Sequence, residues 1–208
     1  VAHGFDPQLV QTVVCWPQTA GHLTSHPGVS HITFIGSQSV AHHVAASAAK
    51  SLTPVVAELG GKDPFIILDS ASRDIKRIAE VILRGTFQAA GQNCIGIERV
   101  IAPGAIHDKL VELLAPRVKA LRLGPEADVG AMISDASFDR LEELIGEAVS
   151  QGARLLAGGK RYNHPDYPQG HYFQPTFLAD VTPDMRIAQN ECFAPVLTLL
   201  RAKSSSPE

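Results

Sequence analysis

The stretch Pro54-Val55-Val56-Ala57-Glu58-Leu59-Gly60-Gly61-Lys62 joins an apolar run to a carboxylate and two glycines. Its adjacent valines favour an extended backbone, so the run predicts a strand. Upstream, apolar runs within 9–16 and 29–35 flank a small-residue segment that stops at Pro27-Gly28, and an Ala- and His-rich segment covers 38–50. Strands that alternate with helices pair in parallel through right-handed crossovers. We therefore expect the first 60 residues to form the trailing part of a doubly wound sheet.

The remaining residues predict a second α/β domain. Phe65-Ile66-Ile67-Leu68 is a strand candidate, and apolar residues then recur at helical spacing from Ile75 to Ile82. Two more amphipathic helices are predicted over 106–118 and 138–148. Strands are expected over 154–157 and 172–178, with a turn-rich surface loop between them that contains Pro165, Pro168 and Gly170.

A cysteine stands 36 positions after Glu58, in Gly91-Gln92-Asn93-Cys94. A lone cysteine is usually a small buried hydrophobe, and a glutamate at a strand end is usually a surface charge. Together, however, a thiol that can ionise and a carboxylate that can activate water indicate covalent catalysis through a thioester. Gly91 can end the preceding helix and let a loop carry the thiol.

Four segments of the chain resemble the NAD(P)-dependent aldehyde dehydrogenase family. Besides the two segments that hold Glu58 and Cys94, Thr33-Phe34-Ile35-Gly36-Ser37 resembles the family's Phe-Thr-Gly-Ser segment. Glu191-Cys192-Phe193-Ala194-Pro195-Val196 resembles its Glu-x-Phe-Gly-Pro-Val segment. All four stand in the family's order, and the resemblance runs from about Val13 to Arg201.

The family resemblance implies an α/β fold in two parts. It predicts an aldehyde-dehydrogenase-like three-layer α/β/α catalytic (thiol) domain with a parallel sheet over 58–201. The trailing βαβ part of a Rossmann-like dinucleotide-binding domain would precede it at 1–57, and a polar tail would follow at 202–208. Because the resemblance begins partway through the family's cofactor domain, we expect the chain to be a fragment.

A closer resemblance covers three short stretches. The residues 51–56, 84–88 and 92–100 are similar to a fungal branch named for meiotic sister-chromatid recombination. That branch implies a full-length protein anchored in a membrane, although no anchor lies in these residues. Any role in meiosis is untested by the sequence.

The resemblance also assigns site residues. It makes Cys94 the catalytic nucleophile and Glu58 the general base that activates a water, a role that favours partial burial of the carboxylate. Cofactor contacts are expected at Gly36, Ser37, Leu59, Gly60, Glu191 and Phe193, with Glu191 on the nicotinamide ribose and Phe193 beside the nicotinamide.

Other interpretations stay open for several of these residues. Gly36-Ser37 is also typical of a simple helix cap, and Phe193 of core packing. Lys62 is either a partner of Glu58 or a turn residue, whereas Cys15 and Cys192 are expected to be structural. Ala194 replaces the family's glycine, which would cost about 1 kcal/mol and tilt Glu191 if that backbone requires a positive φ.

The implied activity is oxidation of a small-molecule aldehyde to a carboxylic acid, with NAD or NADP as hydride acceptor. The family's upstream asparagine, which stabilises the oxyanion, and its adenosine-ribose residues are missing here. We therefore expect this chain alone to bind cofactor weakly or not at all and to lack dehydrogenase activity. The alternatives are a CoA-acylating relative, a cysteine hydrolase, for which no Cys/His motif is present, and a non-catalytic scaffold that keeps the fold.

Composition limits the remaining possibilities. Of 208 residues, 45% are apolar and 19% charged, and the net charge of −3 gives no basic field for nucleic acid. Three cysteines fit a reducing compartment, so we expect a soluble chain on the cytoplasmic side that makes no membrane contact. His22 and His26 lack the partners of a zinc motif, and no metal is expected. Homo-oligomers of the full-length protein are implied by the family.

Overall fold

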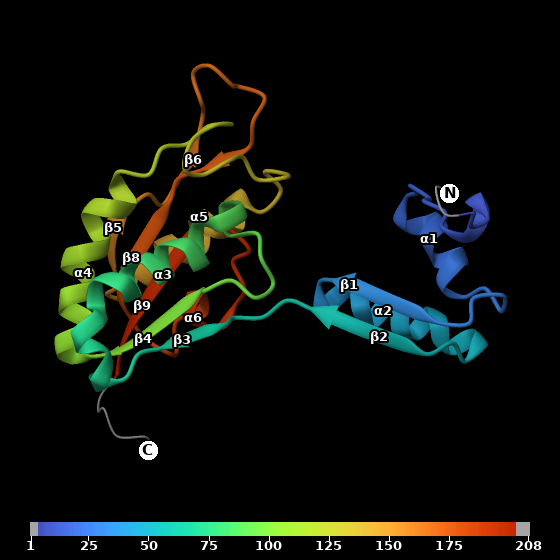
Figure 1. Ribbon diagram of the computed structural model, residues 1–208, viewed down its shortest axis with the longest axis horizontal. Helices are drawn as coiled ribbons and strands as arrows, with labels where there is room; N and C mark the ends of the chain where they lie inside the picture. Colours follow the sequence, from blue (N-terminus) through green and yellow to red (C-terminus); the bar gives the residue numbers. More distant parts are fainter. Residues whose placement is uncertain (1–3, 203–208) are drawn as a thin grey trace. The chain divides into compact units, whose positions relative to one another are not determined.

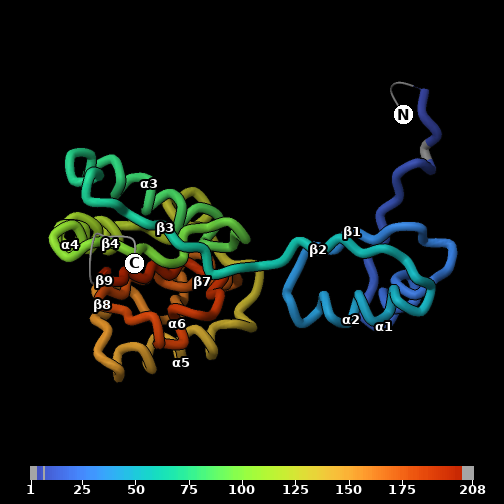
Figure 2. The backbone as a smooth tube through the Cα atoms, turned by 90° about the horizontal axis from the view of Figure 1, so that it is seen from below, coloured from blue at the N-terminus to red at the C-terminus, as the bar shows by residue number. Residues whose placement is uncertain are grey.

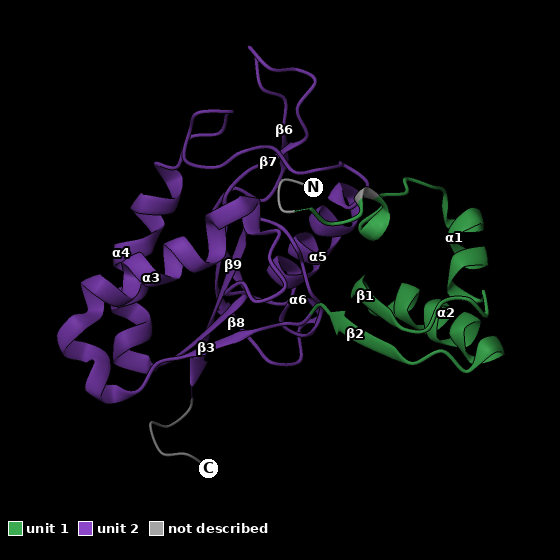
Figure 3. Cartoon of the chain, turned by 45° about the vertical axis from the view of Figure 1, so that its right-hand side comes forward, with its two compact units in different colours: residues 1–60 green, residues 61–208 purple. Residues whose placement is uncertain are grey.

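The computed structural model describes residues 4–202. The chain forms two compact units, Val1–Gly60 (unit 1) and Gly61–Glu208 (unit 2), which Figure 3 distinguishes by colour. The division follows Gly60, whereas the expected domain boundary follows residue 57. Glu58 therefore lies in unit 1 and Cys94 in unit 2.

Unit 1 contains a parallel βαβ element. Strand β1 pairs with β2 in parallel, from Ile32 opposite Val55 to Gly36 opposite Leu59, and helix α2 packs on both strands. The elements of unit 1 are η1 (Pro7–Leu9), α1 (Pro17–Thr24), β1 (Ile32–Gly36), α2 (Gln38–Ala48), η2 (Ala49–Ser51) and β2 (Val55–Leu59). The crossover from β1 through α2 to β2 is the one that the alternating pattern predicts.

The strand predicted within 9–16 is wrong. Residues 11–16 adopt no regular secondary structure, and Leu9 ends a short 3-10 turn. Val10, Val14 and Trp16 are 81%, 96% and 80% exposed. A β-prone run becomes a strand only where a neighbouring strand takes up its backbone hydrogen bonds, and the described strands of unit 1 pair only with each other.

Unit 2 is built on a five-stranded sheet in the order β3-β4-β9-β8-β5. Strands β3, β4, β9 and β8 run parallel, and β5 is antiparallel to β8. The elements of unit 2 are β3 (Pro64–Ile66), η3 (Asp69–Asp74), α3 (Ile75–Phe87), η4 (Gln88–Gly91), β4 (Arg99–Pro103), α4 (Gly104–Lys119), α5 (Phe138–Ser150), β5 (Arg154–Ala157), β6 (Arg161–Tyr162), β7 (Tyr172–Phe173), β8 (Thr176–Val181), α6 (Arg186–Gln189) and β9 (Val196–Ala202).

The edge strand β5 adds one antiparallel strand to the otherwise parallel sheet that was expected. Parallel neighbours need a crossover connection, usually a helix, between them. The chain instead runs from β5 to β8 through the small antiparallel β6–β7 ladder, without a helix. It therefore re-enters the sheet in the opposite direction.

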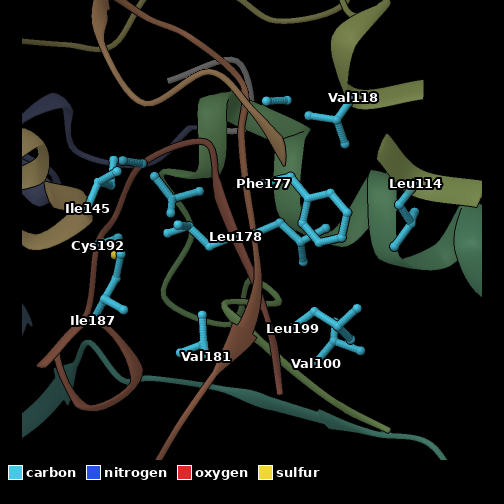
Figure 4. Packing of buried hydrophobic residues seen from close by; sticks show 14 of the residues in the cluster. Val100, Leu114, Val118, Ile145, Phe177, Leu178, Val181, Ile187, Cys192 and Leu199 are labelled. Atoms are coloured by element: carbon cyan, nitrogen blue, oxygen red, sulfur yellow. The ribbon is translucent and has the colours of Figure 1, made fainter. Parts of the chain in front are cut away.

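Helices cover both faces of the sheet, which gives the three layers that were predicted. Helices α3 and α4 lie on one face, and α5 and α6 on the other (Figures 1 and 2). The first five residues of β9 are buried, as a strand covered on both faces requires. In Figure 4, Phe177 and Leu199 lie on the same side of the sheet as Leu114 of α4, and Ile145 of α5 lies on the other.

Among residues 4–202, no helix has both the length and the apolar character to cross a bilayer.

We expect Leu114→Ala to lower the free energy of unfolding of unit 2 by about 2–5 kcal/mol, because Leu114 is fully buried and its loss leaves a cavity. The matched control is Leu68→Ala, since Leu68 is 63% exposed and should change stability by less than about 1 kcal/mol. Urea unfolding followed by tyrosine fluorescence measures both, because all three tyrosines belong to unit 2. Equal effects of the two substitutions would contradict the core described above.

Candidate active site

Cys94 follows a strained turn at the end of α3. Ala89, Ala90 and Gly91 are three consecutive residues in the left-handed region, with φ of 54°, 55° and 70°. Glycine adopts this region without penalty, but it costs alanine about 1–2 kcal/mol. Backbone strain of this kind is typical of functional sites, where the surrounding structure holds it in place.

The side chains beside Cys94 fix the loop that carries it. Gln92 bridges two backbone groups, since its Nε2 donates to the Ala89 carbonyl at 3.1 Å and its Oε1 accepts from the Ile133 N–H at 3.0 Å. The Asn93 Oδ1 accepts from the Ile95 N–H at 3.1 Å. Cys94 is left exposed, and its own N–H meets no acceptor within residues 4–202. The loop thus presents a thiol together with a free backbone donor.

Gly91 joins this loop to the segment 191–196. A Cβ on Gly91 would lie 2.0 Å from the carbonyl oxygen of Ala194, a distance that no side chain can occupy. The left-handed residue of the 191–196 segment is Phe193, with φ of 49°. The strain expected at Ala194 is therefore not found, and alanine is accommodated there.

A buried ion pair lies under the same segment. Lys62 Nζ is 2.6 Å from Glu98 Oε2, and the two side chains are 5% and 6% exposed. Lys62 is therefore a partner of Glu98. Sequence reasoning missed Glu98, although a glutamate that directly precedes the strand β4 was a signal that it is paired.

Glu191 and Phe193 differ from buried core residues. Burial and the nearby Glu98 carboxylate raise the pKa of Glu191, against a hydrogen bond from the Gly61 backbone. Phe193 is 42% exposed, so it does not pack as a core residue. Cys192 between them is buried, and burial raises the pKa of its thiol. The segment therefore offers a carboxylate and an aromatic ring at the surface, with an inert thiol beneath.

The predicted residues of unit 1 meet at one end of the βαβ element. Pairing places Ile35 opposite Glu58 and Gly36 opposite Leu59, at the carboxyl ends of the two strands. Ser37 is the N-cap of α2, and its hydroxyl does not cap the helix. Ligands of open α/β sheets bind at such strand ends, and anions bind at helix N-termini. Glu58 is exposed within unit 1, in contrast to the partial burial expected of it.

The structure thus gathers the predicted residues into two groups. Gly36, Ser37 and Glu58 lie at one edge of unit 1. Leu59 and Gly60 follow Glu58 directly in the sequence. The loop of Cys94 and the segment with Glu191 and Phe193 share a surface of unit 2 through the contact at Gly91. Across residues 4–202, no three His, Cys, Asp or Glu side chains are placed to hold a metal ion.

The chain thus combines an α/β/α unit, which carries an exposed thiol on a strained loop, with a βαβ element. A profile of the Aldehyde dehydrogenase family matches residues 1–206, and the chain belongs to that family, as the motifs predicted. It is 57% identical to an aldehyde dehydrogenase-like protein of Saccharomyces cerevisiae, covering 96% of this chain and 33% of that protein. The chain is also 54% identical to a similar protein of Schizosaccharomyces pombe, and that match covers 97% of this chain and 39% of the relative.

Solved structures give the same family. NADP-dependent glyceraldehyde-3-phosphate dehydrogenase from Bacillus halodurans, complexed with NADP, superposes with a TM-score of 0.79 at 39% identity, over 89% of this chain and 37% of that one. Betaine aldehyde dehydrogenase from Staphylococcus aureus, in complex with NAD+, superposes with a TM-score of 0.81 at 31% identity. This match covers 89% of this chain and 37% of that one. The chain spans between 33% and 39% of the length of the two yeast relatives.

We expect Gly91→Ala to destabilise unit 2 by about 2–4 kcal/mol, because the new Cβ would collide with the Ala194 carbonyl and would sit at a positive φ. Gly146→Ala is the matched control, since nothing lies within 4 Å of a Cβ there and alanine favours the helix α5. Urea unfolding compares the two. A Gly91→Ala protein as stable as the Gly146→Ala protein would refute the close approach.

Glu191→Gln tests the burial of that carboxylate. The raised pKa means that the native state holds its proton more tightly than the unfolded chain, so stability falls as pH rises through the range just above the usual value of 4.5. Glutamine has no such proton. The melting temperature of the variant minus that of the unmodified chain should therefore increase between about pH 4 and pH 7. A difference that stays flat or falls would show that Glu191 is not desolvated.

Proposed function

We propose that the full-length protein oxidises an aldehyde to a carboxylic acid, with NAD or NADP as the hydride acceptor. The single observation that carries the proposal is the presentation of Cys94, exposed and next to its own free N–H, on a loop held by three left-handed residues. The NAD+ and NADP complexes of the two similar structures support the choice of cofactor.

The chemistry begins at Cys94. Its thiolate attacks the aldehyde carbon and forms a tetrahedral thiohemiacetal, and the oxygen gains negative charge as the bond forms. The Cys94 N–H is placed to donate a hydrogen bond to that oxygen. When bound, NAD or NADP supplies the acceptor for the hydride that leaves the substrate carbon. The oxidised adduct is then a thioester on Cys94.

Glu58 would complete the reaction. Its carboxylate takes a proton from a water, which attacks the thioester carbon and releases the acid and the Cys94 thiolate. The exposure of Glu58 within unit 1 supports a role toward a group outside that unit.

The residues present fit a dinucleotide. In unit 1, the hydroxyl of Ser37 leaves the first-turn N–H groups of α2 uncapped, and a Cβ at Gly36 would lie 2.7 Å from the ring of Phe34. Glycine at position 36 therefore makes room for the Phe34 ring beside the N-terminus of α2, where an anion would bind. Leu59 ends the paired strand β2, and Gly60 follows it. In unit 2, the Glu191 carboxylate can accept from ribose hydroxyls, and the exposed ring of Phe193 offers a flat apolar surface.

Incubation with p-nitrophenyl acetate tests the nucleophile without any cofactor. We expect digestion and mass spectrometry to find the acetyl group on Cys94 and not on Cys15 or Cys192. Cys94 lies on a loop fixed by three left-handed residues and by Gln92, whereas Cys15, although exposed, lies in an irregular segment, and Cys192 is buried with a raised pKa.

Cys94→Ala should abolish this labelling, and Cys15→Ala is the matched control that should leave it unchanged. Label spread evenly over the cysteines, or its absence in the full-length protein, would refute the assignment of Cys94 as the nucleophile.

A further inference from the structure

The backbone of the segment 191–193 is held by one buried side chain. Glu98 Oε1 accepts from the Phe193 N–H at 2.9 Å, and its two oxygens accept from the Cys192 N–H at 3.1 and 2.9 Å. The remaining strong contact of this carboxylate is Lys62 Nζ at 2.6 Å. Glu98 therefore binds two consecutive amides at the point where the chain turns into the left-handed region at Phe193.

The Glu98 carboxylate does more than form an ion pair with Lys62. A buried ion pair is often no more stabilising than apolar residues of the same volume, so its presence is weak evidence for stability. Here the carboxylate also accepts from two backbone donors, the buried Cys192 N–H and the partly buried Phe193 N–H, which an apolar side chain would leave unpaired. Thr198, on the neighbouring strand β9, donates from its Oγ1 to the Glu98 carbonyl at 2.7 Å. This hydrogen bond fixes Glu98 against that strand.

Glu98 also lies on the same short stretch as the nucleophile. Only three residues separate it from Cys94. The loop between them is anchored by the Ile97 N–H, which donates to the Gly85 carbonyl at 3.0 Å. One side chain thus links the loop that carries the thiol to the segment that carries Glu191 and Phe193.

We infer that Glu98, held by Lys62, is a positioning residue that orients Glu191 and Phe193 toward the cofactor. The inference rests on the proposed function, because it assigns those two residues to NAD(P). Glu98 itself contacts neither substrate nor cofactor. Its two accepted hydrogen bonds set the backbone from which the carboxylate of Glu191 and the ring of Phe193 project, so their loss weakens cofactor binding without touching the thiol.

Two double variants of the full-length protein separate the hydrogen bonds from the charges. Lys62→Met with Glu98→Gln removes both charges but keeps a carbonyl acceptor for the two amides. Lys62→Met with Glu98→Met removes the acceptor as well. Neither variant leaves a buried unpaired charge, which single substitutions would do. The measurements are the Kd for NAD+ and NADP+ by calorimetry, the rate of Cys94 acetylation by p-nitrophenyl acetate, and amide hydrogen exchange at Cys192 and Phe193.

We expect the Met/Gln variant to keep the Kd of the unmodified protein within about threefold and the Met/Met variant to raise it about tenfold. Acetylation of Cys94 should stay within about twofold in both. Equal Kd values for the two variants, or acetylation that falls in parallel with cofactor binding, would overturn the positioning role.

Hydrogen exchange keeps this test separate from the proposed function. If the unmodified protein binds neither NAD+ nor NADP+, the proposed function fails and with it the cofactor role of Glu98. The two amides should still exchange at least tenfold faster in the Met/Met variant than in the Met/Gln variant. Equal exchange in the two variants would show that Glu98 does not hold the segment at all.

Discussion

The contact between Gly91 and the backbone of Ala194 is the constraint on which the site of unit 2 depends. It requires a residue without a Cβ at the end of the strained turn, and it brings two segments about a hundred positions apart in sequence against each other. The Cys94 loop therefore has a fixed neighbour, and that neighbour carries Glu191 and Phe193. The Cys94 thiol and the residues proposed to contact the cofactor share one surface because residue 91 is a glycine. A Cβ at that position would collide with the Ala194 carbonyl.

Several features of the site oppose stability. Ala89 and Ala90 adopt backbone conformations that cost alanine about 1–2 kcal/mol each, and the desolvated carboxylate of Glu191 has a raised pKa. These costs are offset by a sheet whose central strands are buried on both faces and by helices such as α4 that pack on it. The proposed function explains why the backbone strain at Ala89 and Ala90 is retained. A relaxed loop would not hold the Cys94 thiol and its N–H in one arrangement.

The sequence predicts the architecture well where periodicity is strong. The helices α3, α4 and α5 and the strands β1 and β2 follow from apolar spacing, and the segment motifs predict the family. The apolar run before Trp16 does not form a strand, since no described strand pairs with it. The antiparallel edge strand β5 is set by a connection that lacks a helix, which apolar spacing does not reveal.

Motifs name the candidate site residues, but they do not give the geometry around them. Cys94, Glu58 and Glu191 stand in recognisable motifs, whereas the left-handed turn at Ala89 and Ala90 has no local signal, because alanine normally avoids it. The pairing of Lys62 with Glu98 joins residues 36 positions apart, and only the packed unit reveals it. Spacing along the chain did not decide the partner of Lys62, because Glu58 is nearer in the sequence than Glu98.

The central claim is that Cys94 and Glu58, which lie on separate compact units, serve one reaction. The most direct test is the lifetime of the acetyl group on Cys94 after excess p-nitrophenyl acetate is removed from the full-length protein. Glu58→Gln should prolong that lifetime at least tenfold at neutral pH while Cys94 is still acetylated, and Glu126→Gln, which removes an exposed carboxylate of unit 2, should leave it unchanged. An acetyl group lost from the Glu58→Gln protein as fast as from the unmodified protein would contradict the pairing.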